Sequence, residues 1–167
     1  MKPHAFCPWC AARLVERESA GRTRLCCAAE GCGYVCYDNP LPVVAALVEH
    51  EGEVILARNK GWPAGWFGLV TGFLERDETP EEGILRELRE ELGLSGEIVR
   101  LIGVYPFVQR NEVIVAYHVR ASGTVALGEE IESIKRIDPA KLRPWPFGTG
   151  QAVADFLAQR GTDGTRE

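Results

Sequence analysis

The sequence predicts an α/β (α+β) protein of strands and helices, with a small cysteine-rich segment ahead of it. All six cysteines precede Asp38, and strand-like apolar runs follow it. Between these runs lies one segment with the signals of a helix start and a helix stop. We therefore divide the chain into a cysteine-rich segment over 1–38, a larger domain over 39–160 and a flexible tail over 161–167.

Composition sets limits on the class of protein. Nearly half of the 167 residues are apolar, as in globular proteins, yet no apolar run approaches the length needed to span a bilayer. The first residues run directly into a cysteine pair without an apolar signal core, so we expect a cytoplasmic location and no membrane contact. The net charge of −5 argues against general affinity for nucleic acid, but it leaves room for a small nucleotide substrate bridged by divalent cations.

The cysteine-rich segment has the spacing of a zinc ribbon. Cys7 and Cys10 form a C-x2-C knuckle, and Cys27 and Cys32 form a C-x4-C knuckle beyond a short hairpin. Four thiolates in two such knuckles suit tetrahedral zinc, which would supply much of the folding energy of so small a segment. A secreted disulfide protein would spread its cysteines along the whole chain.

The fourth ligand of this site is open on spacing alone. Cys26 adjoins Cys27, and Cys36 follows Cys32 by four residues. We favour Cys27, because Gly33 directly after Cys32 suits the tight turn of a knuckle. Unliganded buried thiols are the plainer alternative.

After Asp38 the sequence predicts five strands and two helices. Glu51 and Gly52 are expected to form a hairpin turn between the first two strands, and Thr149 is expected to cap the last helix. The strands are expected over 43–48, 53–58, 67–71, 98–107 and 113–119, with a further strand candidate over 133–137.

The first helix carries its own boundary signals. Thr79 and Glu82 can form a capping box, Pro80 suits the first helical position, and Gly93 suits the C-terminal stop. On such a helix Glu87, Glu90 and Glu91 lie on one face, because residues three and four positions apart are neighbours.

That acidic face has two interpretations. Glu87, Glu90 and Glu91 repel one another in the absence of a cation, and hard divalent cations such as Mg²⁺ prefer oxygen ligands of this kind. A solvated acidic helix face explains the three residues equally well. The residues around them favour the metal site.

From Gly72 to Leu94 the chain fits the pattern G-x5-E-x7-R-E-U-x-E-E-x-G-U, where U is a bulky aliphatic residue. Nine constrained positions within 23 residues make a chance fit very improbable. The segment resembles the Nudix box of the Nudix hydrolases (MutT-like), and the resemblance implies the Nudix fold, a mixed sheet between helices. It also implies attack of a metal-activated water on a diphosphate.

The resemblance assigns roles by position. It implies that Glu87, Glu90 and Glu91 hold Mg²⁺ or Mn²⁺, and that the backbone carbonyl of Gly72 adds a ligand. It also implies that Arg86 orients these glutamates.

A supporting role falls to Glu78, which the resemblance pairs with the arginine of the box. Many family members use a further glutamate after the box as base or metal ligand. Glu130 is our candidate by spacing, with Glu129 and Glu132 as rivals and Glu112 as a weaker one.

A zinc ribbon ahead of a Nudix domain resembles the NADH pyrophosphatases, which implies a homodimer. That group carries S-Q-P-W-P-F-P shortly after the box, whereas this chain has Pro144-Trp145-Pro146-Phe147 roughly fifty residues beyond it. We therefore expect Trp145 and Phe147 to pack against the last helix, and the substrate stays open.

Substrate contacts are expected near the box. Trp66 and Phe73 can stack on a flat moiety, and Arg58 can meet phosphate, although core packing and exposed charge explain such residues equally well. The function expected is Mg²⁺- or Mn²⁺-dependent hydrolysis of a nucleoside diphosphate linked to another moiety, such as NAD(H), FAD or ADP-ribose. The alternative is a non-catalytic module that binds a nucleotide or nucleic acid through the ribbon and the Nudix fold.

Overall fold

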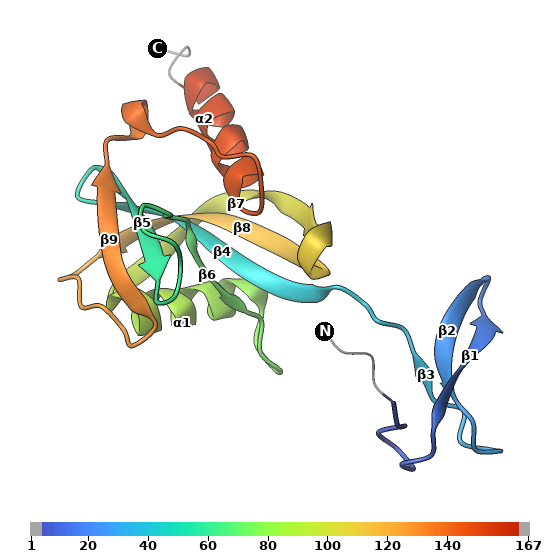
Figure 1. Ribbon diagram of the computed structural model, residues 1–167. Helices are drawn as coiled ribbons and strands as arrows, with labels where there is room; N and C mark the ends of the chain where they lie inside the picture. Colours follow the sequence, from blue (N-terminus) through green and yellow to red (C-terminus); the bar gives the residue numbers. More distant parts are fainter. Residues whose placement is uncertain (1–4, 164–167) are drawn as a thin grey trace. The chain divides into compact units, whose positions relative to one another are not determined.

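The computed structural model describes residues 5–163, and these divide into two compact units between Asn39 and Pro40 (Figure 1). The boundary expected from the sequence falls after Asp38. No helix in the described part of the chain is long and apolar enough to cross a membrane.

The first unit is a three-stranded antiparallel sheet in the order β1-β2-β3. Its strands are β1 (Leu14–Ser19), β2 (Arg22–Cys27) and β3 (Val35–Cys36). Ala20 and Gly21 join β1 to β2, both with positive φ, as the tight primed hairpin turns require.

The second unit is a six-stranded mixed sheet with one helix on each face (Figure 1). The order is β7-β8-β4-β5-β9, and β6 also pairs with β4. The strands are β4 (Leu41–His50), β5 (Glu53–Asn59), β6 (Val70–Phe73), β7 (Ser95–Phe107), β8 (Glu112–Ser122) and β9 (Ile131–Ile137). The helices are α1 (Pro80–Leu92) and α2 (Gly150–Asp163), with short 3-10 turns at Val108–Arg110 and Pro139–Lys141. This arrangement confirms the expected mixed sheet between helices.

Strand β4 is the centre of the sheet and contributes to both cores. Along one edge it runs parallel to β8 over its whole length, while its other edge pairs first with β6 and then with β5. Successive side chains on a strand point to opposite faces. Val43, Ala45 and Leu47 accordingly pack towards Phe156 of α2, in a core separate from the one under α1.

The core under α1 uses the alternate residues of β4. Val44, Ala46 and Val48 are fully buried beneath Ile84, Leu88 and Leu92 of the helix. This apolar contact fixes the rotation of α1 about its axis, and it thereby decides which way the glutamates of the helix face.

Five strands extend one to three residues beyond their expected ranges at one or both ends, and two elements differ from the expectation in another way. The strand expected over 67–71 is β6 at Val70–Phe73, because Gly68 instead makes an isolated bridge to Ala57. Helix α2 continues to Asp163, which includes part of the expected tail, and residues 164–167 lie outside the described part of the chain.

Candidate functional site

Helix α1 begins and ends where its sequence predicts. The hydroxyl of Thr79 accepts a hydrogen bond from the Glu82 amide at 3.2 Å, and the Glu82 carboxylate accepts one from the Thr79 amide at 2.8 Å. Pro80 is the first helical residue, and Gly93 ends the helix with a left-handed φ of 67°. The capping box and the glycine stop are confirmed.

A single arginine ties the box together. Arg86 donates two hydrogen bonds to the Glu78 carboxylate, at 2.8 and 3.1 Å. It also donates to Glu87 at 2.7 Å, to Glu90 at 3.0 Å and to the carbonyl of Phe73 at 3.1 Å. Hydrogen bonds from Arg86, and then from a backbone amide, lower the pKa of Glu78 to about 2. The guanidinium thus fixes the loop and the helix against each other.

Glu91 is the most constrained carboxylate of the group. Its residue is only 5% exposed, and among the described residues its Oε2 has no hydrogen-bond partner. Burial, together with the charges of Glu87, Glu130 and Glu90, raises the pKa of its carboxyl to about 8. A buried carboxylate facing three others is costly unless a cation joins them.

Gly72 allows the closest approach to this group. A Cβ at this position would lie 1.9 Å from the carboxyl carbon and Oε1 of Glu87. The pKa of Glu87 is itself raised, since burial outweighs the hydrogen bond from Arg86. The carboxylate therefore occupies the space that any other residue would fill with its side chain.

These groups line a cavity of about 590 Å³, the carboxylate pocket. Its walls include Glu112 and Glu129, which the sequence offered as alternatives to Glu130, and also Glu75 and Arg110, which the sequence did not single out. The full lining is Val43, Asn59, Trp62, Thr71, Gly72, Phe73, Glu75, Arg86, Glu87, Glu90, Glu91, Arg110, Glu112, Glu129 and Glu130.

The rival glutamates after the box fall in different places. Glu130 lines the carboxylate pocket, and its charge acts on both Glu87 and Glu91. Glu129 lines the same pocket, whereas Glu132 forms an ion pair with Arg58 at 3.0 Å and lines neither cavity described here. Glu112, the weaker alternative, also lines the carboxylate pocket, so the structure sets Glu132 aside and Glu130 stays the predicted residue.

A second cavity, the aromatic pocket, has a volume of about 790 Å³. Its walls come from the loop before β6, from the β7–β8 turn and from the segment before α2. They comprise Val43, Trp62, Pro63, Gly65, Trp66, Phe67, Gly68, Leu69, Thr71, Phe107, Gln109, Arg110, Glu112, Ile114, Trp145, Phe147, Gly148 and Thr149.

The expected substrate contacts are divided among these surroundings. Phe73 lines the carboxylate pocket and Trp66 lines the aromatic pocket, both about half exposed. Arg58 lines neither, because its guanidinium is held by Glu132 and by the Ser133 hydroxyl at 3.2 Å. Its expected phosphate contact therefore has no support from the structure.

The expected packing role of the Trp-Pro-Phe segment is right for one ring and wrong for the other. Trp145 packs against the core beneath α2. Phe147 instead is 47% exposed, and its ring lies 5.5 Å from that of Trp66 at the wall of the aromatic pocket. The phenyl ring of Phe147 therefore lies against the loop before β6.

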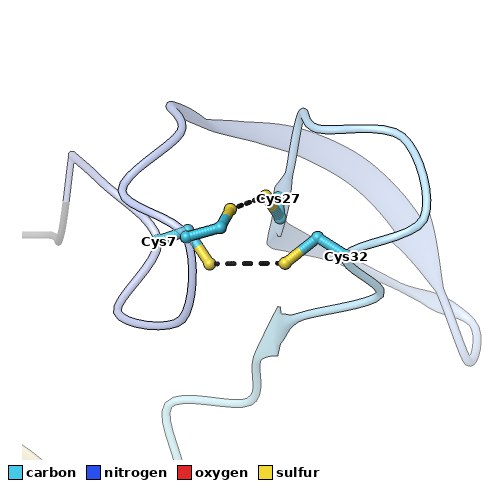
Figure 2. Close-up of side chains that lie close together, drawn as sticks. Cys7, Cys27 and Cys32 are labelled. Atoms are coloured by element: carbon cyan, nitrogen blue, oxygen red, sulfur yellow. Dashed lines mark hydrogen bonds between the residues drawn. The ribbon is translucent and has the colours of Figure 1, made fainter.

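The first unit brings four cysteines together, namely Cys7, Cys10, Cys27 and Cys32 (Figure 2). Their sulfur atoms all lie within 4.8 Å of one another, with Cys10 to Cys27 at 3.4 Å and Cys7 to Cys32 at 3.7 Å. Tetrahedral zinc with bonds of about 2.3 Å requires sulfur separations of about 3.8 Å, so this set fits the ion.

Backbone amides support the same sulfur atoms. Trp9 donates to Cys7 Sγ and Ala29 donates to Cys27 Sγ, each at 3.4 Å. Cys26, by contrast, is oriented towards the carbonyl of Arg24. Cys27 rather than Cys26 therefore completes the cluster, as the glycine after Cys32 predicts.

Comparison with known proteins gives the chain its family. The model of the NUDIX domain matches residues 39–157. An ADP-ribose pyrophosphatase from Methanocaldococcus jannaschii is 37% identical over 131 residues, which cover 74% of this chain and 77% of that protein. A NAD-capped RNA hydrolase NudC from Pseudomonas putida is 25% identical over 93% of this chain.

The chain spans 55% of that NudC, and 25% of a Mycobacterium bovis NudC to which it is 39% identical over 79 residues. The crystal structure of a Nudix hydrolase from Nitrosomonas europaea shares the fold, with a TM-score of 0.81 at 24% identity. It covers 95% of this chain and 93% of its own. With its box intact on α1 and a family model that matches most of its length, the chain belongs to the Nudix hydrolase family.

Proposed function

We propose that this Nudix hydrolase cleaves the diphosphate bond of a nucleoside diphosphate linked to another moiety, giving two phosphomonoesters. The observation that carries the proposal is the buried, unpaired carboxylate of Glu91 among Glu87, Glu90 and Glu130. A metal-dependent hydrolase needs this costly arrangement to hold its cations. A module that only binds nucleotides does not need it.

The donor set fits Mg²⁺ or Mn²⁺. Glu87, Glu90, Glu91 and Glu130 offer hard carboxylate oxygens, and Gly72 is proposed to add its carbonyl. When bound, a divalent ion would lower the pKa of a coordinated water and neutralise charge on the phosphoryl oxygens.

The chain's own residues then have separate tasks. Arg86 and Glu78 hold the helix glutamates in place through the hydrogen bonds described above. Glu130 comes from a loop whose path is fixed by a hydrogen bond from the Lys60 amide to the Glu130 carbonyl at 2.8 Å. We assign Glu130 as the further glutamate, either as a ligand or as acceptor of the proton from the attacking water.

We propose that Cys7, Cys10, Cys27 and Cys32 hold one structural Zn²⁺. The sulfur separations and the amide hydrogen bonds to two of the sulfur atoms support this assignment. Because the unit has only short strands and few fully buried residues among those described, bound metal would supply much of its stability.

The relatives' names support the proposed substrate class. ADP-ribose, NAD(H), FAD and an RNA with a 5′ NAD cap all contain a nucleoside diphosphate joined to a second group, and the first and last of these name relatives of the chain. Trp66 and Phe73 stay proposed contacts for a flat moiety. The cytoplasmic location and the homodimer stay predictions.

The test is Glu91→Gln, assayed with Mg²⁺ on these four substrates and with nucleotide sugars. We expect the release of phosphomonoesters to fall at least about 100-fold, because the neutral amide cannot replace the carboxylate. Glu132→Gln is the matched control, since Glu132 pairs with Arg58 away from the carboxylate pocket. Full activity in Glu91→Gln, with circular dichroism unchanged, would refute the catalytic assignment.

A further inference from the structure

The carboxylate pocket and the aromatic pocket adjoin each other. Some residues line both pockets. They come from β4, from the loop and strand before α1 and from the β7–β8 turn. These shared residues are Val43, Trp62, Thr71, Arg110 and Glu112. Arg110 and Glu112 are the charged residues among them, so they lie where the two pockets adjoin.

The aromatic pocket has an exposed ring on each of two separate segments. Trp66 is 52% exposed and Phe147 is 47% exposed, and their rings lie 5.5 Å apart at an angle of 36°. Exposed aromatic side chains that converge on a cavity are typical of ligand sites, because planar heterocycles stack on their faces. The surface suits a flat ring better than a sugar or a phosphate.

Arg110 supplies a cation at the junction of the pockets. The other arginine of the carboxylate pocket, Arg86, is already bound to three carboxylates. Arg110 is 67% exposed, and Glu112 is the ion-pair partner that the described residues give it, at 3.8 Å. The Arg110 guanidinium can therefore turn towards an anionic group. The Glu112 side chain, only 13% exposed, keeps Arg110 close to the junction of the pockets.

Resting on the proposed function, we propose that the aromatic pocket takes a planar heteroaromatic ring of the substrate, stacked on Trp66 and Phe147. Arg110 then binds the phosphate nearest to that ring. The diphosphate lies in the carboxylate pocket and the ring lies beyond Arg110. The site thus selects diphosphates that carry a nucleobase or a similar ring within reach of the bond that is cleaved.

The test compares two ligands that differ in the ring alone. Binding of AMP and of ribose 5-phosphate is measured by calorimetry on the full chain with Mg²⁺ present. Stacking on an aromatic residue changes affinity roughly 5- to 150-fold by alanine substitution. We expect AMP to bind more tightly than ribose 5-phosphate by such a factor. Phe147→Ala and Trp66→Ala should each lower the affinity for AMP by a factor in this range and leave the affinity for ribose 5-phosphate unchanged.

Arg110→Gln should lower the affinity for both ligands by the same factor, because both carry the phosphate. Arg110→Lys should retain part of that affinity. Arg120→Gln is the control for lost charge, since Arg120 is exposed on β8 and lines neither pocket. In the hydrolysis assay the Phe147 and Arg110 variants should raise KM more than they lower kcat.

Two outcomes would overturn the inference. The first is equal affinity of the wild-type chain for AMP and ribose 5-phosphate. The second is that Phe73→Ala loses AMP binding while Phe147→Ala keeps it, which would place the ring in the carboxylate pocket. Failure of the wild-type chain to hydrolyse any of the diphosphates would instead refute the proposed function, while the binding comparison would still decide where the ring lies.

Discussion

Replacing Gly72 by alanine adds one methyl group where β6 passes α1. The new Cβ would lie 1.9 Å from the Glu87 carboxyl group, whereas ordinary contacts begin at 3.4 Å. The Glu87 carboxylate must therefore retreat by about 1.5 Å. A misplacement of about 1 Å in an active site can cost roughly 100-fold in rate, so we expect kcat/KM to fall at least about 100-fold.

Stability should change little in the same variant. Gly72 lies in a strand with φ outside the left-handed region, so alanine suits the backbone and the side chain of Glu87 can move. We expect the free energy of unfolding to stay within about 1 kcal/mol of the wild type. Urea denaturation and steady-state kinetics on one preparation measure both quantities.

The control for this prediction is Gly161→Ala. Gly161 belongs to α2, and a Cβ there would have no atom within 4 Å, so activity should be unchanged. Full kcat/KM in Gly72→Ala would contradict the placement of Glu87 against Gly72. A loss of both activity and folding would show that the glycine serves the sheet rather than the site.

Three further perturbations separate the parts of the molecule. Cys27→Ser should lose zinc and the adjacent Cys26→Ser should keep it, by metal analysis of each chain; equal zinc contents would refute the ligand assignment. Leu88→Ala, at a fully buried position, should cost about 2–5 kcal/mol of unfolding free energy, and a cost below 1 kcal/mol would contradict its core position. Burial lowers the pKa of His118, against the opposing effect of Glu49, so the folded state favours neutral imidazole. The free energy of unfolding should therefore decline as pH falls below about 6.5, and less so in His118→Gln; parallel pH profiles would count against this.

Local signals predicted helix α1 to the residue. Thr79, Glu82 and Gly93 satisfy backbone groups within a few positions of themselves, so their effect can be read without the rest of the fold. Strand β6 was placed three residues early, because pairing with β4 decides where it begins. Nothing within the segment itself reports that partner.

The site follows the same division. The glutamates of α1 share a face by helical spacing alone, and the box around them could be recognised in the sequence. Phe147 and Arg110 could not, because they reach the aromatic pocket from segments far apart in the chain. Among the glutamates after the box, spacing favoured Glu130 over its neighbours. The structure removes only Glu132 from the carboxylate pocket, because that residue pairs with Arg58.

The central position of β4 has a consequence for how the site tolerates change. Gly72 pairs with Val44, a fully buried residue of that strand, so amide exchange at β6 should require nearly global unfolding. The loop with Trp66 and the segment with Phe147 have no such anchor and should exchange faster. Mutation can then reshape recognition in these segments at little cost to the groups that break the bond. A scaffold divided in this way can acquire new substrates while its chemistry stays fixed.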